Sequence, residues 1–144
     1  MSYQEKRNLM YLISSVLIFS FYWLYVLQLN QEGKLESTNW GVLILLLVPV
    51  HIVFNVILEV VFVIINTITE GEEEPSVVDE FDQSIQFRAT RNAYFVFIAG
   101  FLIAMATVAL EMPMYVMFNL LVLSFFVTEV VWSTSHLYFY RRGL

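Results

Sequence analysis

Four long apolar runs constrain the fold of this chain more than any other feature of its sequence. They cover about residues 9–29, 40–65, 93–110 and 114–138. A helix of about 20 apolar residues crosses the roughly 30 Å of hydrocarbon in a bilayer, and it satisfies its own backbone hydrogen bonds, as a segment in lipid must. The sequence therefore predicts an all-α, polytopic membrane protein, with four transmembrane helices bundled into one domain, residues 1–144.

The overall composition agrees with this prediction. Of the 144 residues, 59% are hydrophobic and 14% are charged, whereas soluble domains average about 45–50% apolar and about 25% charged residues. The chain has no cysteine, which excludes disulfides, thiol catalysis and thiolate metal sites. It also lacks a phosphate-binding loop, a nucleophile elbow, a zinc-protease motif and a basic nucleic-acid patch. We therefore expect no enzymatic activity, no cofactor, no bound metal and no nucleic-acid partner.

The positions of the basic residues predict how the helices are oriented. Only Lys34 lies in the connections that follow the first and third spans. The other six basic residues precede the first span, follow the fourth, or lie between the second and third: Lys6, Arg7, Arg88, Arg91, Arg141 and Arg142. Since Lys and Arg accumulate in cytoplasmic loops, we expect a multi-pass protein of the inner (cytoplasmic) membrane with both termini in the cytoplasm.

The connection between the second and third spans, residues 66–92, is acidic at first and helical later. Residues 70–75 read Glu-Gly-Glu-Glu-Glu-Pro, a charged and helix-breaking stretch. From Ser76 onward only Gly100 interrupts the helical pattern, so the third helix is expected to extend into the cytoplasm. Its apolar positions at helical spacing are Val78, Phe81, Ile85 and Ala89. They could dock a second copy or a cytoplasmic partner through residues 70–92, or pack on the protein's own loop or the headgroup surface.

Polar residues recur at helical spacing within the second and fourth spans, so that each set shares one face of its helix. Such groups face the protein interior, because lipid would leave them unpaired. The first span brings Tyr11, Ser14 and Ser15 to the same level, in the inner half of the membrane. The start of the third span adds Arg91 at this level. The predicted buried polar cluster consists of His51, Asn55, Glu59, Arg91, Asn119, Glu129, Ser133 and His136.

The two carboxylates of this cluster, Glu59 and Glu129, leave three interpretations open. A charge in the middle of a bilayer costs roughly 2.5 kcal/mol or more, so such a residue usually marks a functional site. The carboxylates could bind a proton or another cation. A metal site is disfavoured because His136 lies seven residues, or about 10 Å of helix, from Glu129. They could instead be structural, either paired with Arg91 or neutral and hydrogen-bonded.

The segment from Asp79 to Tyr94 resembles a family of small prokaryotic four-span membrane proteins of unknown function. In that family an Asp-Glu-x-Asp…Arg-x-x-Arg juxtamembrane helix leads into the third span, and residues 79–82 and 88–91 follow this pattern here. The family resembles products often encoded beside helix-turn-helix regulators. The resemblance implies the four-span layout, but no substrate and no catalytic residue.

The function expected from these observations is that of a non-enzymatic accessory or regulatory protein of the inner membrane. The alternative is a small transporter, or an ion- or proton-binding protein, that uses the polar cluster around Glu59 and Glu129. Because four helices leave little room for a transport pathway, we expect the chain to form a homo-oligomer in the lipid bilayer.

Overall fold

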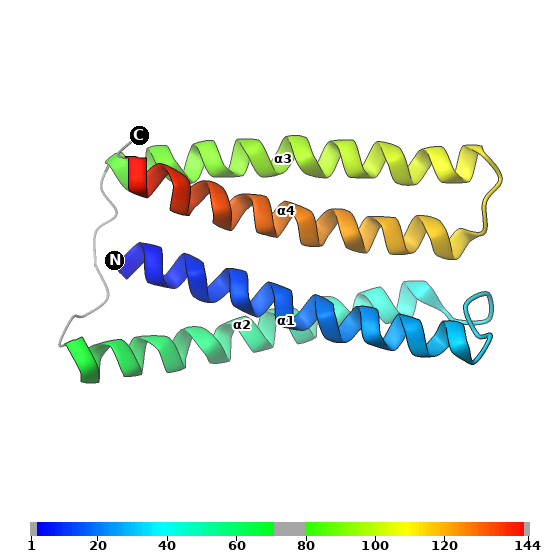
Figure 1. Ribbon diagram of the computed structural model, residues 1–144, viewed down its shortest axis with the longest axis horizontal. Coiled ribbons are helices and arrows are strands. Elements are labelled where there is room, and N and C mark those ends of the chain that lie inside the picture. The colour runs from blue at the N-terminus through cyan, green and yellow to red at the C-terminus, as the bar shows by residue number, and fades with distance from the viewer. Residues whose placement is uncertain (1–2, 71–79, 143–144) are drawn as a thin grey trace.

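Four helices make up the computed structural model, which describes residues 3–70 and 80–142 and contains no strand in that part of the chain (Figure 1). They are α1 (Tyr3–Gln31), α2 (Trp40–Glu70), α3 (Glu80–Ala109) and α4 (Met114–Arg142). Each is long and apolar enough to cross a membrane. The predicted all-α bundle of four helices is confirmed, and its helices indicate a multi-pass membrane protein.

All four helices continue beyond the predicted spans at the end of the bundle that holds both chain termini, here called the terminal end (Figure 1). The third helix is already formed at Glu80, about four turns before the apolar run begins. Hydropathy locates only the part of a helix that lies in lipid, and a helix can continue in polar residues past it. Residues 71–79, which include most of the acidic stretch and Val78, lie outside the described residues.

Turn geometry stops the helices at the opposite end, here called the loop end. After α1, the amide of Lys34 donates to the carbonyl of Leu29 at 2.9 Å, and Gly33 adopts a φ of 69°. After α3, the amide of Met112 donates to the carbonyl of Thr107 at 3.0 Å, and Glu111 has a φ of 60°. Both are helix-ending turns that need one residue in the left-handed conformation. This explains why the predicted and observed helix ends nearly coincide here.

The helices pair as two hairpins that meet through α1 and α4. Figure 1 shows the order α3, α4, α1, α2 across the molecule, with α2 crossing behind α1. The backbone of α3 packs closely only on α4, while α1 packs on both α4 and α2. Among the described residues, α3 makes no close backbone approach to α1 or α2. The α1–α4 contact therefore joins the two halves of the bundle.

The apolar stripe of α3 packs on α4 of its own chain. Ile85 and Ala89 are completely buried, and α4 is the helix against which α3 packs. The ring of Phe81 lies 5.8 Å from that of Tyr140, whose hydroxyl donates to Asp82 at 2.5 Å. The N-terminal turns of α3 are thus covered along this stripe by the C-terminal turns of α4.

A close approach of α3 and α4 occurs at Gly100. A Cβ placed on Gly100 would lie 2.5 Å from the Cβ of Ser124. The Ser124 hydroxyl donates to the carbonyl of Leu120 at 2.7 Å, which fixes its side chain. Small residues that let backbones approach are a common basis of helix packing in membranes.

We predict that Gly100→Ala lowers the free energy of unfolding by about 1–3 kcal/mol, because the two helices must separate to admit the new methyl group. Thermal unfolding in detergent would measure this. Gly41→Ala is the matched control, since its Cβ would meet Asn39 at an ordinary 3.5 Å. Equal stability of the two variants would show that the α3–α4 contact does not depend on Gly100.

Candidate functional site

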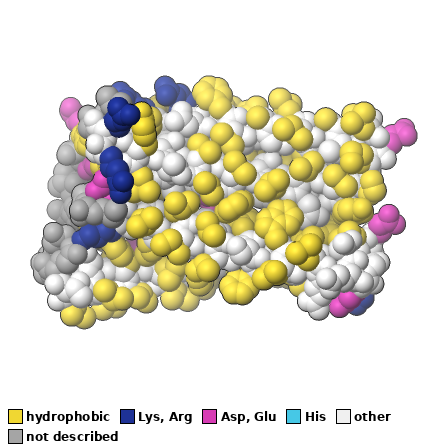
Figure 2. All heavy atoms as spheres, in the orientation of Figure 1, with side chains coloured by type: hydrophobic (Ala, Val, Ile, Leu, Met, Phe, Trp, Pro, Cys, Tyr) yellow, Lys and Arg dark blue, Asp and Glu magenta, His cyan; other side chains and the backbone are white. Residues whose placement is uncertain are grey.

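Polar side chains gather inside a bundle whose exterior is mainly apolar. Figure 2 shows hydrophobic side chains over most of one face, with charged groups near the two ends. Inside the terminal half, hydrogen bonds connect side chains of α1, α2 and α4. Two groups of contacts can be distinguished, one around each glutamate.

The first group pairs Glu59 with a cation from α1. Arg7 forms an ion pair with Oε1 of Glu59, and the hydroxyl of Tyr11 donates to Oε2 at 2.8 Å. The guanidinium of Arg7 also donates to the Tyr11 hydroxyl at 3.3 Å. Both oxygens of Glu59 therefore have a partner, and its charge is compensated.

The second group joins three helices around Glu129. Ser15 donates to Oε2 of Glu129 at 2.6 Å, and Nε2 of His51 lies 2.8 Å from Oε1. The same nitrogen is 3.1 Å from Nδ2 of Asn55, whose Oδ1 accepts a hydrogen bond from Ser14 at 2.6 Å. No three His, Asp or Glu side chains converge as metal ligands anywhere in residues 3–70 and 80–142.

A plug of aromatic rings separates these groups from the loop end. Phe19 is 1% exposed, and its ring lies 5.8 Å from His51, 5.0 Å from Phe126 and 6.2 Å from Phe125. Toward the loop end, beyond this plug, the hydroxyl of Tyr22 donates to Asn119 at 3.0 Å. The plug marks the inner limit of the polar region that contains both glutamates.

A cavity of about 530 Å³ opens beside the two groups, with walls from all four helices. It extends from Glu129 toward Gln4 and Tyr140 near the terminal end, and we call it the vestibule. Its span along α4, from Phe125 to Tyr140, corresponds to about 22 Å of helix. The lining residues are Gln4, Arg7, Asn8, Tyr11, Ser15, Asn55, Asp82, Gln86, Ala93, Phe125, Thr128, Glu129, Trp132, Ser133, His136 and Tyr140.

His136 has unfulfilled hydrogen-bonding capacity in this vestibule. Its side chain lines the cavity and the residue is only 5% exposed. Its ring packs between Trp132 at 4.2 Å and Tyr140 at 6.1 Å. Neither ring nitrogen has a partner among the residues that the structure describes. Buried polar groups are nearly always hydrogen-bonded, so these nitrogens need water or a bound molecule.

The structure brings most of the predicted cluster together. His51, Asn55 and Glu129 form one hydrogen-bonded group, Glu59 belongs to its neighbour, and Ser133 and His136 line the vestibule.

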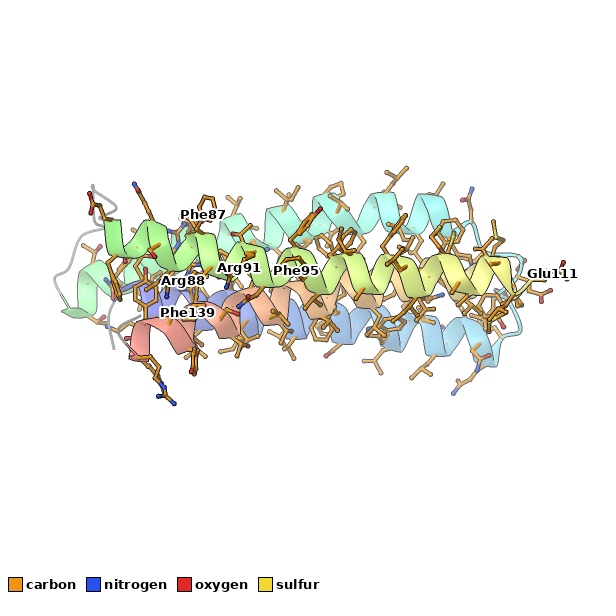
Figure 3. All side chains as sticks on the ribbon, turned by 90° about the horizontal axis from the view of Figure 1, so that it is seen from above. Phe87, Arg88, Arg91, Phe95, Glu111 and Phe139 are labelled. Atoms are coloured by element: carbon orange, nitrogen blue, oxygen red, sulfur yellow. The ribbon has the colours of Figure 1, made fainter. Side chains whose placement is uncertain are left out.

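Arg91 and Asn119 do not belong to this polar region. Asn119 lies beyond the aromatic plug. Arg91 is exposed on α3, near Arg88 (Figure 3), and α3 does not approach α2. The alternative in which Arg91 pairs with Glu59 or Glu129 is therefore wrong. Arg7 is the cation that reaches Glu59, and Glu129 contacts Ser15 and His51 instead.

Sequence reasoning missed Arg7, although a signal for it existed. Arg7, Tyr11 and Ser15 recur every four residues on α1, as His51, Asn55 and Glu59 do on α2. Matching these two stripes would have identified Arg7 and Tyr11 as the partners of Glu59.

We predict that Arg7 and Glu59 stabilise the fold as a pair. Glu59→Gln leaves a partly buried guanidinium uncompensated and should cost about 2 kcal/mol of unfolding free energy, less than the roughly 3–5 kcal/mol of fully buried pairs. Arg7→Gln should cost a similar amount, and the double variant should cost clearly less than the sum. Reversible unfolding of the four proteins in a detergent mixture measures this cycle.

The exposed contact of Lys34 with Glu32, at 3.1 Å, supplies the control. Glu32→Gln should leave unfolding unchanged, because water and salt screen exposed pairs. Strictly additive effects of Arg7→Gln and Glu59→Gln would contradict the pairing.

The sequence matches no protein-family model, no curated protein and no solved structure. The resemblance of residues 79–94 to a four-span family therefore stays a prediction.

Proposed function

We propose that this chain is a small membrane transporter that binds a solute in the vestibule and exchanges a proton at Glu129. One observation carries the proposal: Glu129 lies at the inner end of a polar cavity between helices that are otherwise apolar. Ionisable residues inside a membrane protein usually belong to substrate or proton pathways. Glu129 has no Lys or Arg partner in the described part of the chain, so its charge depends on its protonation and on His51.

The contacts of His51 support a role for Glu129 in proton exchange. Nε2 of His51 lies within hydrogen-bond distance of both Glu129 and Asn55. If Nε2 carries a hydrogen, it donates to the ionised carboxylate; if it does not, it accepts from the Asn55 amide or from a protonated Glu129. A proton that arrives at Glu129 thus changes the hydrogen bonds between α2 and α4.

The arrangement of polar spaces supports transport in particular. A second cavity, of about 570 Å³, lies at the loop end, where Trp40 and Tyr115 are among its lining residues. The aromatic plug around Phe19 lies between the two cavities. Since two hairpins meet through α1 and α4 at this plug, a tilt of one hairpin against the other would open the loop side and close the vestibule.

We also propose that the terminal end faces the cytoplasm of a cell with this protein in its inner membrane. Figure 2 shows Lys and Arg side chains gathered at that end, as expected for the cytoplasmic side. Homo-oligomerisation stays a prediction that follows from the small size of the chain.

An accessory role through residues 70–92 has less support than transport. The expected docking stripe on α3 includes Ile85 and Ala89, and both are buried. A partner could not use these two side chains without first separating α3 from α4.

Proton movement tests the proposed function. Liposomes that contain the protein should dissipate a pH gradient faster than protein-free liposomes, with a potassium ionophore clamping the voltage and an internal dye reporting pH. Glu129→Gln should return the rate to that of protein-free liposomes, because an amide cannot take up the proton. The Glu129→Gln variant should still fold, because a glutamine side chain can form hydrogen bonds with Ser15 and His51.

The controls separate loss of function from loss of fold. Glu32→Gln, at an exposed position outside both cavities, should keep the wild-type rate. Thermal unfolding of Glu129→Gln should match the wild type. If wild-type liposomes are as tight as protein-free ones, the cluster around Glu129 serves the fold and not transport.

Water access to the vestibule gives an independent prediction. The chain has no cysteine, so a single introduced thiol reports on its own position. Thr128 lines the vestibule, whereas its neighbour Val127 is exposed on the outer surface. Thr128→Cys should react with a charged, membrane-impermeant thiol reagent added from the cytoplasmic side, and Val127→Cys should not. Equal reactivity of both would contradict a water-filled vestibule.

A further inference from the structure

The vestibule carries two polar anchors at different depths on the same face of α4. Glu129 lies at the inner end, and His136 lies seven residues nearer the terminal end, which corresponds to about 10 Å of helix. Both line the cavity. A ligand that satisfies both must therefore be elongated, with a polar group at each end.

The inner anchor favours a positive charge. A carboxylate has about four acceptor sites, and Ser15 and His51 occupy two of those of Glu129. The charged side chains in the wall are Arg7, Asp82 and Glu129. The charge of Arg7 is already compensated by Glu59, and Asp82 accepts a hydrogen bond from Tyr140 nearer the terminal end. At the inner end the wall is therefore acidic through Glu129. An ammonium group fits the remaining acceptor sites of Glu129.

The outer anchor favours a neutral polar group. His136 is 95% buried, and no group in the described chain bonds either of its ring nitrogens. A neutral imidazole offers one donor and one acceptor. A hydroxyl can satisfy either of them, whereas an apolar ligand end would leave both nitrogens unpaired.

The surface between the two anchors is aromatic. Trp132 lies one turn from each anchor and lines the cavity, and Tyr140 extends the aromatic wall past His136. Such faces bind apolar rings and also attract nearby cations. The cavity volume of about 530 Å³ lies in the range of small-molecule sites, roughly 300–1,000 Å³.

We infer that the vestibule binds an elongated amphipathic amine, with its ammonium group at Glu129, its aromatic or apolar body on Trp132 and a hydroxyl at His136. The inference rests on the proposed function, because it names the solute of the same cavity.

A matched set of four probes tests the inference on the full chain in lipid nanodiscs. Tyramine has both end groups, phenethylamine lacks the hydroxyl, tyrosol replaces the amine with a neutral hydroxyl, and desaminotyrosine replaces it with a carboxylate. By calorimetry, with empty nanodiscs as the blank, tyramine should bind about tenfold tighter than tyrosol, which corresponds to about 1.4 kcal/mol. Tyramine should bind about threefold tighter than phenethylamine, as one hydrogen bond allows, and desaminotyrosine should bind weakest.

Two variants assign the ends of the ligand. Glu129→Gln should abolish the preference for tyramine over tyrosol and keep the preference for tyramine over phenethylamine. His136→Phe should abolish the preference for tyramine over phenethylamine and keep the preference for tyramine over tyrosol. A structural role of either residue would weaken all probes alike. Should Glu129→Gln unfold, Glu129→Asp keeps the charge and should keep the preference for the amine. Glu32→Gln should change nothing.

Tyrosol or desaminotyrosine binding as tightly as tyramine would overturn the inference. Absence of binding by all four probes would also overturn it. If proton flux through the wild type nevertheless persists, only the ligand class is wrong. If proton flux is absent as well, both the ligand class and the proposed transport function are wrong.

Discussion

The hydrogen bonds of Glu129 are the interaction on which this structure most depends. Lipid is as apolar as a leucine side chain, so apolar helices in a membrane gain little from contacting one another. The second helix is the most apolar of the four, and little of it is buried. Its contact with α4 is slight, and that contact includes the pair of His51 with Glu129. A single carboxylate from α4 thus binds both helices of the other hairpin, through Ser15 and His51.

The same interaction creates the vestibule. Because Glu129 binds α1 and α2 directly, polar groups of three helices meet at one depth, while α3 remains on the far side of α4. The space nearer the terminal end is then enclosed by α3 residues such as Asp82 and Gln86 on one side and by Asn55 on the other. The cavity exists because the described parts of α2 and α3 do not pack against each other and leave space between them.

The sequence was sufficient for the helices and for most of the polar faces. Runs of apolar residues locate the spans, and a spacing of four residues places His51, Asn55 and Glu59 on one face of α2. The sequence could not predict which helices pack against each other, because periodicity indicates which face of a helix is buried but not which helix covers it. Arg91 was considered as a partner of Glu59 or Glu129 because of its depth, and depth could not distinguish it from Arg7, which pairs with Glu59. Asn119 lies on the same face of α4 as Glu129. Phe19 of α1 nevertheless separates the two residues, because it packs on Phe125 and Phe126 between them.

The two glutamates show why an acid in a span needs to be judged by its partners. Glu59 has a guanidinium and a phenol on its two oxygens, an arrangement that compensates its charge and fixes α1 against α2. Glu129 has a serine and a histidine, neither of which carries a permanent charge. A rule that treats every carboxylate at membrane depth as functional would assign both residues the same role. Their partners distinguish them: Glu59 is paired with a permanent cation, whereas Glu129 joins three helices through groups that carry no permanent charge.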